Sequence, residues 1–252
     1  MIVAATRLTL LATNDLHGHL APAAAAQLAA LKAEAAAAGP VLLLDGGDAI
    51  ARGNISWRAG GEWMHDRMRA AGYDALALGN REYHPWRGPQ AAKLRRAPAP
   101  IVCSNVRPAG WGGTVPSLRL ALADGLTVRL LGLTPLMITA DHPLRWISAS
   151  RFLPPAEAVT EQLAAVDDRE LVIVLSHSGE RADRALAAAC PQLAVILGGH
   201  SHTPFDARIG DTHLAQAPAH GAALTKMTLA VDGPQVRQAT VERVPLTQGS
   251  AR

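Results

Sequence analysis

Residues 8–17 of the chain are LTLLATNDLH, an apolar run that changes within two residues to polar side chains. In 8–12, three leucines surround a single threonine, and an apolar run of this length indicates a short strand buried in a sheet. Asp15 and His17 follow the run directly. The first predicted strand therefore ends in two side chains that can bind a metal ion.

The same arrangement recurs along the chain. Further apolar runs occupy 41–44, 75–78, 171–175 and 194–197. Each is followed within a few residues by potential metal ligands, namely Asp48, Asn80, His177, and the pair His200 and His202. Because ligands bind beyond the carboxyl ends of the strands in open α/β sheets, we expect these side chains to converge on one crevice.

Helical patterns separate the predicted strands, at 23–38, 62–71, 155–166 and 181–190. Strands that alternate with helices predict an α/β architecture, in which helices cover buried sheets. A further short strand is expected at 101–103.

The second half of the chain adds antiparallel strands. Asp124-Gly125 lies between apolar runs at 118–123 and 126–133, which predicts a hairpin. Strand patterns also end the chain, at 213–215, 224–231 and 236–244. The sheets should therefore be mixed. No repeat or linker is evident, so we expect one catalytic domain over 1–252, with 107–116 as a surface loop.

Composition excludes several classes of protein. The chain has 252 residues, of which 49% are hydrophobic and 18% charged, with a mean hydropathy of +0.10. These values fit a globular protein with a sizeable core. The net charge is +3, and the basic residues are scattered rather than clustered, so we expect no nucleic-acid partner. Cys103 and Cys190 are expected to be buried free thiols.

The first residues do not resemble a secretory leader, since the apolar segment is short and no small-residue cleavage site precedes Asn14-Asp15. No stretch is long and apolar enough to span a membrane. We therefore expect a cytoplasmic enzyme with no membrane partner.

The candidate ligands combine carboxylate, imidazole and amide groups, without a thiolate. Divalent manganese, iron, zinc, nickel or cobalt suits such a set better than calcium or magnesium. Seven ligands exceed the four of one tetrahedral site, whereas two ions bridged by a shared carboxylate would use them all. Each motif alone is weak evidence, because single histidines are usually structural, but their joint order favours a metal site.

The remaining histidines match no such pattern and are expected mostly at the surface: His19, His65, His142, His213 and His220. Asp45 is expected to support the site by hydrogen bonding rather than to bind metal.

These motifs resemble the calcineurin-like metallophosphoesterase superfamily, and more narrowly the catalytic domain of bacterial 5′-nucleotidases and cyclic-nucleotide phosphodiesterases. The resemblance rests on Thr13-Asn14-Asp15-Leu16-His17-Gly18, Gly46-Gly47-Asp48, Gly79-Asn80-Arg81-Glu82, Ser176-His177 and Gly198-Gly199-His200-Ser201-His202-Thr203, and it spans nearly the whole chain.

The resemblance implies a four-layer αββα sandwich and a metal-dependent hydrolase of a small-molecule phosphate ester, either a phosphatase or a phosphodiesterase, with nucleotides among the candidate substrates. It assigns one divalent ion, with manganese preferred, to Asp15, His17 and His202. A second ion falls to Asn80, His177 and His200, and Asp48 bridges the two. A bridging hydroxide is the implied nucleophile.

The chain departs from the family at the residue after Asn80. The family has a histidine there, which acts near the leaving group and is oriented by an acid three residues later. This chain has Arg81 and His84 at those positions. An arginine does not release its proton at ordinary pH, so Arg81 cannot be a general acid, although a fixed guanidinium can stabilise transition-state charge. His84 is the alternative proton donor.

Two other functions remain open on the same residues. One is the hydrolysis of a sulfur-linked sulfate on the same metal cradle, and the other is a scaffold that has lost catalysis. Retention of all seven ligand types argues against the scaffold. The nucleotidases of this branch carry a further domain that binds the nucleoside, so we expect nucleotide specificity not to follow from the resemblance.

Overall fold

The computed structural model describes residues 5–53, 55–139 and 141–247. One six-stranded sheet has the order β14-β13-β1-β2-β3-β4. Its strands are β1 (Thr6–Thr13), β2 (Val41–Asp45), β3 (Ala75–Ala77), β4 (Ile101–Val102), β13 (Ala223–Asp232) and β14 (Gln235–Pro245). The first four strands are parallel, and β13 and β14 extend the sheet in antiparallel fashion beside β1. The carboxyl ends of β1, β2 and β3 thus lie at one edge.

The second six-stranded sheet has the order β11-β12-β10-β9-β7-β6. Its strands are β6 (Ser117–Ala121), β7 (Thr127–Leu133), β9 (Leu171–Ser176), β10 (Val195–Leu197), β11 (Phe205–Ile209) and β12 (Thr212–Gln216). Its four central strands are parallel, and its two edge strands are antiparallel to their neighbours. A separate pair joins β5 (Val106–Arg107) to β8 (Arg151–Phe152).

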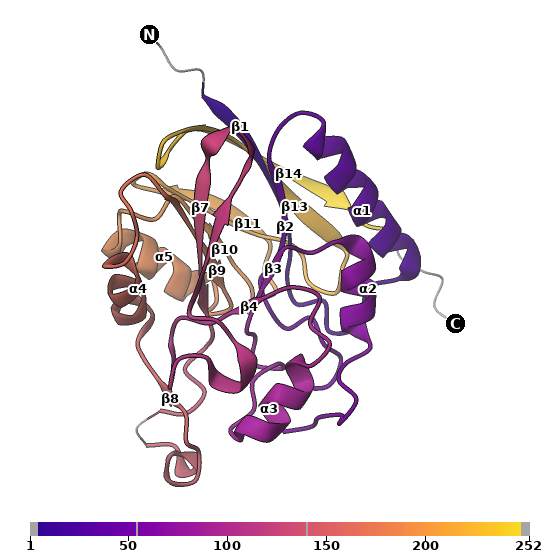
Figure 1. Ribbon diagram of the computed structural model, residues 1–252, viewed down its shortest axis with the longest axis vertical. Helices are drawn as coiled ribbons and strands as arrows, with labels where there is room; N and C mark the ends of the chain where they lie inside the picture. Colours follow the sequence, from indigo (N-terminus) through magenta and orange to yellow (C-terminus); the bar gives the residue numbers. More distant parts are fainter. Residues whose placement is uncertain (1–4, 54, 140, 248–252) are drawn as a thin grey trace.

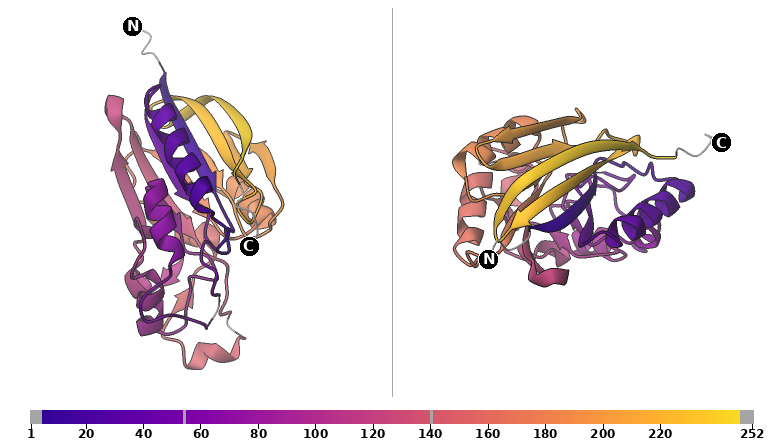
Figure 2. Two further views of the ribbon diagram at one scale, coloured as in Figure 1. Left: turned by 90° about the vertical axis from the view of Figure 1, so that its right-hand side faces the viewer. Right: turned by 90° about the horizontal axis from the view of Figure 1, so that it is seen from above.

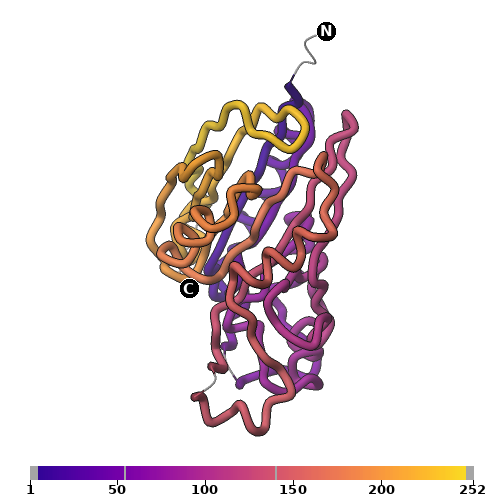
Figure 3. Tube along the Cα trace, turned by 90° about the vertical axis from the view of Figure 1, so that its left-hand side faces the viewer, coloured from indigo at the N-terminus to yellow at the C-terminus, as the bar shows by residue number. Residues whose placement is uncertain are grey.

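Helices cover the outer faces of the two sheets (Figures 1 and 2). On the first sheet lie α1 (Pro22–Ala36), α2 (Met64–Ala71) and α3 (Arg87–Leu94). On the second lie α4 (Pro155–Leu163) and α5 (Glu180–Ala189), on the face toward the viewer in Figure 3. Short 3-10 turns occupy η1 (Trp111–Gly113), η2 (Ala123–Gly125) and η3 (Pro143–Trp146). The layers are therefore helix, sheet, sheet and helix, which confirms the αββα prediction.

The two sheets pack directly on each other. Alternate residues of the central strands, such as Leu10, Leu44, Ile173 and Leu197, meet in an apolar layer between them. The sheets approach so closely at Gly132 that a side-chain Cβ there would lie 2.1 Å from the carbonyl oxygen of Val102. This close packing holds the carboxyl ends of both sets of parallel strands on the same side of the molecule.

The predicted strands and helices occur within a few residues of the expected bounds, including the hairpin of β6 and β7. The helix α3 and the strands β5, β8 and β11 were not predicted, and neither were the 3-10 turns η1 and η3. The expectation of a surface loop at 107–116 was wrong for Trp111, which is 2% exposed and donates its indole N–H to the carbonyl of His84 at 3.1 Å. Cys103 and Cys190 are buried free thiols, as expected.

Among the described residues, no helix combines the length and the apolar character that crossing a bilayer requires.

Candidate metal centre

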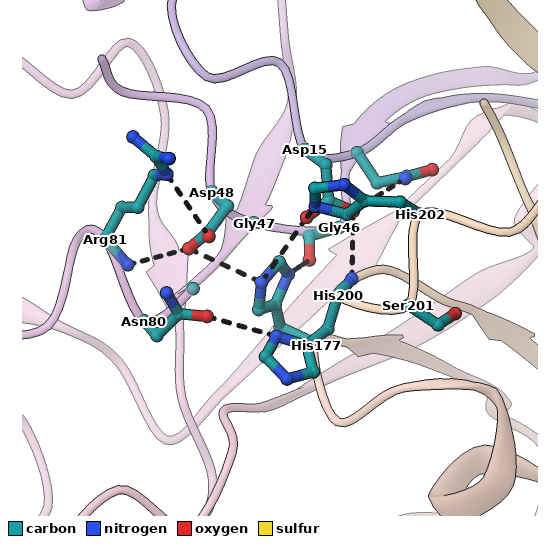
Figure 4. Close-up of polar contacts among 12 residues, drawn as sticks. Asp15, Gly46, Gly47, Asp48, Asn80, Arg81, His177, His200, Ser201 and His202 are labelled. Atoms are coloured by element: carbon teal, nitrogen blue, oxygen red, sulfur yellow. Dashed lines mark hydrogen bonds and ion pairs between the residues drawn. The ribbon is translucent and has the colours of Figure 1, made fainter. Parts of the chain in front are cut away.

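The candidate ligands lie at the carboxyl ends of strands from both sheets. Asp15 and His17 follow β1, Asp48 follows β2 and Asn80 follows β3, all in the first sheet. His177 follows β9, and His200 and His202 follow β10, in the second sheet. Figure 4 shows six of these side chains pointing toward one another. The structure therefore brings together groups that are up to 187 residues apart in the chain.

Left-handed backbone turns position most of these side chains. Among the described non-glycine residues, positive φ occurs at Asp124 in a turn, at His220, and at five of the seven candidate ligands: Asp15, His17, Asp48, His200 and His202. Such conformations cost of order 1 kcal/mol or more each for a residue with a side chain, and they concentrate at functional sites. The strand ends are therefore shaped for the site at the expense of local stability.

Several buried atoms of the cluster have no hydrogen-bond partner among the residues that the structure describes. They are Asp15 Oδ1, His17 Nε2 and His177 Nε2, all of which are buried away from water. A buried polar atom without a partner is costly, and such atoms are rare in folded proteins. Here they face one another, which is the arrangement that a bound cation would satisfy. The residues present thus fit a metal site.

The carboxylate of Asp48 lies between the imidazole of His17, which belongs to the first sheet, and that of His177, which belongs to the second. Its Oδ2 is 3.4 Å from His17 Nε2, and its Oδ1 is 3.4 Å from His177 Nε2. Asp15 Oδ1 is 3.7 Å from each of the same two nitrogens. It also lies 3.1 Å from His202 Nε2, without the alignment of a hydrogen bond. Two groups of three can each surround an ion: Asp15, His17 and His202, and Asp15, Asp48 and His177.

Hydrogen bonds to the remaining polar atoms orient these side chains. His177 donates from Nδ1 to the carbonyl of Gly46 at 2.8 Å, which turns its Nε2 toward the carboxylates. His200 donates from Nδ1 to Asn80 Oδ1 at 3.1 Å. Asp15 Oδ2 accepts from the backbone N–H of His200 at 2.9 Å and from Asn14 Nδ2 at 2.8 Å. Such outer contacts hold metal ligands in place in known metalloproteins.

Opposite charges stabilise each other within the cluster. Burial alone would lower the pKa of His177, but its contact with Asp48 and the charges of Asp48 and Asp15 raise that pKa to about 9. Although burial opposes it, contacts with the histidines hold the pKa of Asp48 and that of Asp15 below the usual value of a carboxyl. The carboxylates of Asp15 and Asp48 are therefore ionised, and positive charge on the nearby histidines balances them. A bound metal cation would supply this positive charge instead.

A second set of buried carboxylates supports the backbone. Glu82 accepts hydrogen bonds from the N–H groups of Asp48, Ile50 and Gly79 at 2.9, 3.1 and 3.1 Å. Asp45 accepts from Thr13 Oγ1 at 2.6 Å and from the N–H of Gly47 at 2.9 Å. Burial and the nearby charges of Glu82 and Asp15 raise the pKa of Asp45 to about 8. Its supporting role matches the prediction from sequence.

Arg81 lies against the central carboxylate (Figure 4). Its backbone N–H donates to Asp48 Oδ1 at 2.7 Å, and its Nε is 3.6 Å from Asp48 Oδ2. Its Nη1 donates to the carbonyl of Ala51 at 2.8 Å, which fixes the guanidinium at the edge of the cluster.

His84 is directed away from this position. It is fully buried, its Nδ1 accepts from the N–H of Trp86 at 3.0 Å, and its Nε2 is 3.3 Å from the carbonyl oxygen of Ile55. Within the described residues no contact joins it to a candidate ligand. Its catalytic role stays a prediction, and its observed contacts are those of a residue that stabilises a loop.

Two of the other histidines differ from the expectation of exposed side chains outside the site. His65 is fully buried in α2. His220 is exposed but lies 3.2 Å from His17, between their Nε2 and Nδ1 atoms. The signal for His220 was present in the sequence, because it follows the carboxyl end of β12 in the same way that the candidate ligands follow their strands.

Comparisons with known proteins agree with this geometry. A family model described as calcineurin-like phosphoesterase matches residues 8–204. A curated 5′-nucleotidase of Bos taurus is 29% identical over 224 residues, which cover 78% of this chain and 38% of that protein.

Two solved structures share the fold. A 5′-nucleotidase precursor from Thermus thermophilus superposes with a TM-score of 0.74 at 26% identity, over 95% of this chain and 54% of its own. A sulfate thiohydrolase, SoxB, from the same genus has a TM-score of 0.73 at 19% identity, over 96% of this chain and 58% of its own. The chain spans about half or less of the length of the first curated relatives it matches.

Proposed function

The chain belongs to the calcineurin-like phosphoesterase family, and we propose that it hydrolyses phosphate esters of a small molecule at a site for two divalent metal ions. The observation that carries this proposal is the cluster of unpaired, buried ligand atoms at the shared edge of the two sheets. We include in the proposal that 1–252 act as one catalytic domain, in a cytoplasmic location.

We assign the ligands in two groups. The first ion would be held by Asp15, His17 and His202, and the second by Asn80, His177 and His200. Asp48 would be shared, in keeping with the equal distances of its two oxygens from the imidazoles of His17 and His177. The donor set suits divalent manganese, iron, zinc, nickel and cobalt, and we take manganese as the preferred metal on the family resemblance.

When bound, the two ions supply the charge that activates water and neutralises the phosphoryl oxygens. The protein's own contribution is mainly positioning. The Gly46 carbonyl and Asn14 hold His177 and Asp15 in place, and Arg81 adds a fixed positive charge at the edge of the site. Because several relatives are named 5′-nucleotidases, nucleoside monophosphates are the first substrates that we would test.

The sulfur-ester alternative shares the metal cradle, and no contact in the site favours it over phosphate. The similarity to SoxB is low in sequence and concerns the fold. A screen that includes phosphate monoesters, phosphate diesters and a thiosulfate ester separates these activities. Protein that binds two ions but cleaves none of these substrates would instead support the catalytically inactive scaffold.

Metal analysis tests the proposal directly. Metal-free protein loaded with Mn²⁺ should bind two ions per chain and hydrolyse small phosphate esters. Asp48→Asn should weaken the binding of both ions together, because Asp48 alone is assigned to both. Asp66→Asn is the matched control, since that carboxylate lies on the surface in ion pairs with Arg69 and Arg96. A single ion in fully active protein would contradict the proposal.

A further inference from the structure

His220 shares an unusual backbone conformation with the candidate metal ligands. Its φ is 60°, within the range of 48–74° shown by the five candidate ligands in left-handed conformation. Positive φ is sterically unfavourable for histidine, because its Cβ comes close to the backbone. The strain indicates that the surrounding structure holds His220 where its imidazole is needed.

The loop that carries His220 is fastened to the end of β1. The backbone N–H of His220 donates to the carbonyl of Asp15 at 2.8 Å, and the N–H of Ala217 donates to Asn14 Oδ1 at 2.8 Å. Gly221 packs so closely that a Cβ there would lie 2.4 Å from the carbonyl oxygen of His19. The position of the His220 imidazole is thus set by the same segment that supplies Asp15 and His17.

The imidazole of His220 makes a polar contact with a candidate ligand. Its Nε2 lies 3.2 Å from His17 Nδ1, and the two ring centroids are 5.1 Å apart in an edge-to-face arrangement. The ring of His202, the other imidazole assigned to the first ion, is 5.5 Å away.

The chemistry of His17 assigns the donor and the acceptor of this contact. Its Nε2 faces Asp15 and Asp48 and is the atom that would bind metal. A neutral imidazole bound through Nε2 carries its proton on Nδ1, which must therefore be the hydrogen-bond donor. His220 Nε2 is then the acceptor.

We propose that His220 is a positioning residue of the first metal site, which accepts the Nδ1–H of His17 and so fixes the orientation and tautomer of that ligand. This inference rests on the proposed function. Outer partners of ligating histidines are commonly carboxylates or backbone carbonyls. A neutral imidazole performs the same orientation without adding negative charge beside the carboxylates of Asp15 and Asp48, which already face His17.

Three substitutions of His220 separate this role from a merely structural one. His220→Gln places a carbonyl oxygen at about the reach of Nε2 and retains an acceptor. His220→Leu imposes the same backbone strain without an acceptor, so these two variants are a matched pair. His220→Gly relieves the strain and removes the acceptor. The exposed His19, whose ring centroid is 5.2 Å from that of His220, supplies the neighbouring control as His19→Ala.

The affinity of the metal-free protein for Zn²⁺ alone, measured by competition with a chelator, is the main readout. We expect about 10–100-fold weaker binding of one of the two ions in the Leu and Gly variants. The Gln variant and His19→Ala should bind close to the wild type. In ¹⁵N-histidine-labelled, Zn²⁺-loaded protein, the Nδ1–H of His17 should be protected from exchange in the wild type and the Gln variant, and it should exchange rapidly with water in the other two.

The outcomes distinguish this proposal from the proposed function. If the wild type binds no ions, the proposed function itself fails. If the wild type binds two ions and His220→Gly binds them equally tightly while remaining as stable to urea, only the role of His220 is overturned. Weaker binding by His220→Gly, with an undiminished urea midpoint, supports positioning because folding is then unharmed.

Discussion

At the scale of single residues, the site depends on backbone conformations that most side chains avoid. Five candidate ligands have positive φ, and Gly79 lies so near Asp48 that a Cβ there would be 2.2 Å from its backbone nitrogen. The polar side chains after each strand therefore leave the strand direction sharply and turn toward one another at the shared edge of the two sheets. The local cost is offset by the many hydrogen bonds that Glu82, Asp45 and Gly46 provide.

Arg81 stands where the family resemblance implies a histidine, and it contacts the central carboxylate Asp48. We expect Arg81→Ala to lower kcat/KM by about 10²-fold on both nitrophenyl and alkyl phosphates, because a fixed positive charge is lost whichever group departs. Arg81→His should favour alkyl phosphates selectively, since these poor leaving groups gain most from a proton donor. Steady-state rates with the metals loaded provide the measurement.

Arg81→Lys is the matched control, because it keeps the charge without the planar guanidinium. It should lose less activity than Arg81→Ala. Unchanged rates in Arg81→Ala on both substrate types would show that Arg81 is not part of the reaction, and the substitution in this chain would then point to a different chemistry.

At the scale of elements, α2 buries a titratable residue away from the metal centre. His65 is fully buried, and neither ring nitrogen has a hydrogen-bond partner among the described residues. Burial, aided by the positive charge of Arg69, lowers its pKa from 6.5 to about 4. The folded chain therefore keeps His65 neutral at a pH at which the unfolded chain protonates it.

This difference predicts a pH-dependent stability with a definite sign. The unfolded state binds the extra proton between pH 6.5 and about 4. The contribution of neutral His65 to the free energy of unfolding is therefore fully present above pH 6.5, and it falls as the pH decreases toward 4. The contribution lost is about 3 kcal/mol. Urea unfolding of wild type and His65→Leu at pH 7 and 4.5 measures it, and the variant should show the smaller decrease.

His19→Leu replaces an exposed histidine and is the control for this comparison. Its pH dependence should match that of the wild type. Equal decreases in the wild type and His65→Leu would mean that His65 does not contribute to acid sensitivity.

At the scale of the whole molecule, the surface charge is small and mixed. The formal net charge is +3 at pH 7, and many exposed arginines pair with acids, including Arg184 with Glu180, Arg208 with Asp211 and Arg237 with Asp232. A long polyanion such as DNA or RNA would find few adjacent unpaired positive charges on such a surface. The proposed small substrate would contact the protein mainly at the site where the two sheets meet.

Salt dependence checks this expectation. Raising KCl from about 50 to 200 mM should change kcat/KM on nitrophenyl phosphate by less than about threefold, because few counterions are released. A protein that contacts six to ten phosphates would lose about 10³–10⁵ in affinity over the same range. A steep salt dependence, together with faster cleavage of DNA or RNA than of small esters, would contradict a small-molecule substrate.

The sequence by itself was sufficient to predict the layered α/β fold and its central strands. Apolar runs such as 8–12 and 171–175 are too short for a typical buried helix and suit the interior of a sheet, so their length and polar flanks identified them. The position of the candidate ligands followed as well, because polar residues directly after buried strands must lie at the sheet edge. Elements without a strong apolar pattern, such as α3 and the half-exposed β11, were not predictable in this way.

Only the tertiary structure decided which side chains face each other. His84 and Arg81 are three residues apart, yet His84 is turned into the loop by Trp86 while Arg81 reaches Asp48. His220 and His17 are 203 residues apart and lie in contact. Sequence patterns identify the buried strands and where each of them ends. The partners across the site depend on how the two sheets pack, which is set by contacts spread over the whole interior.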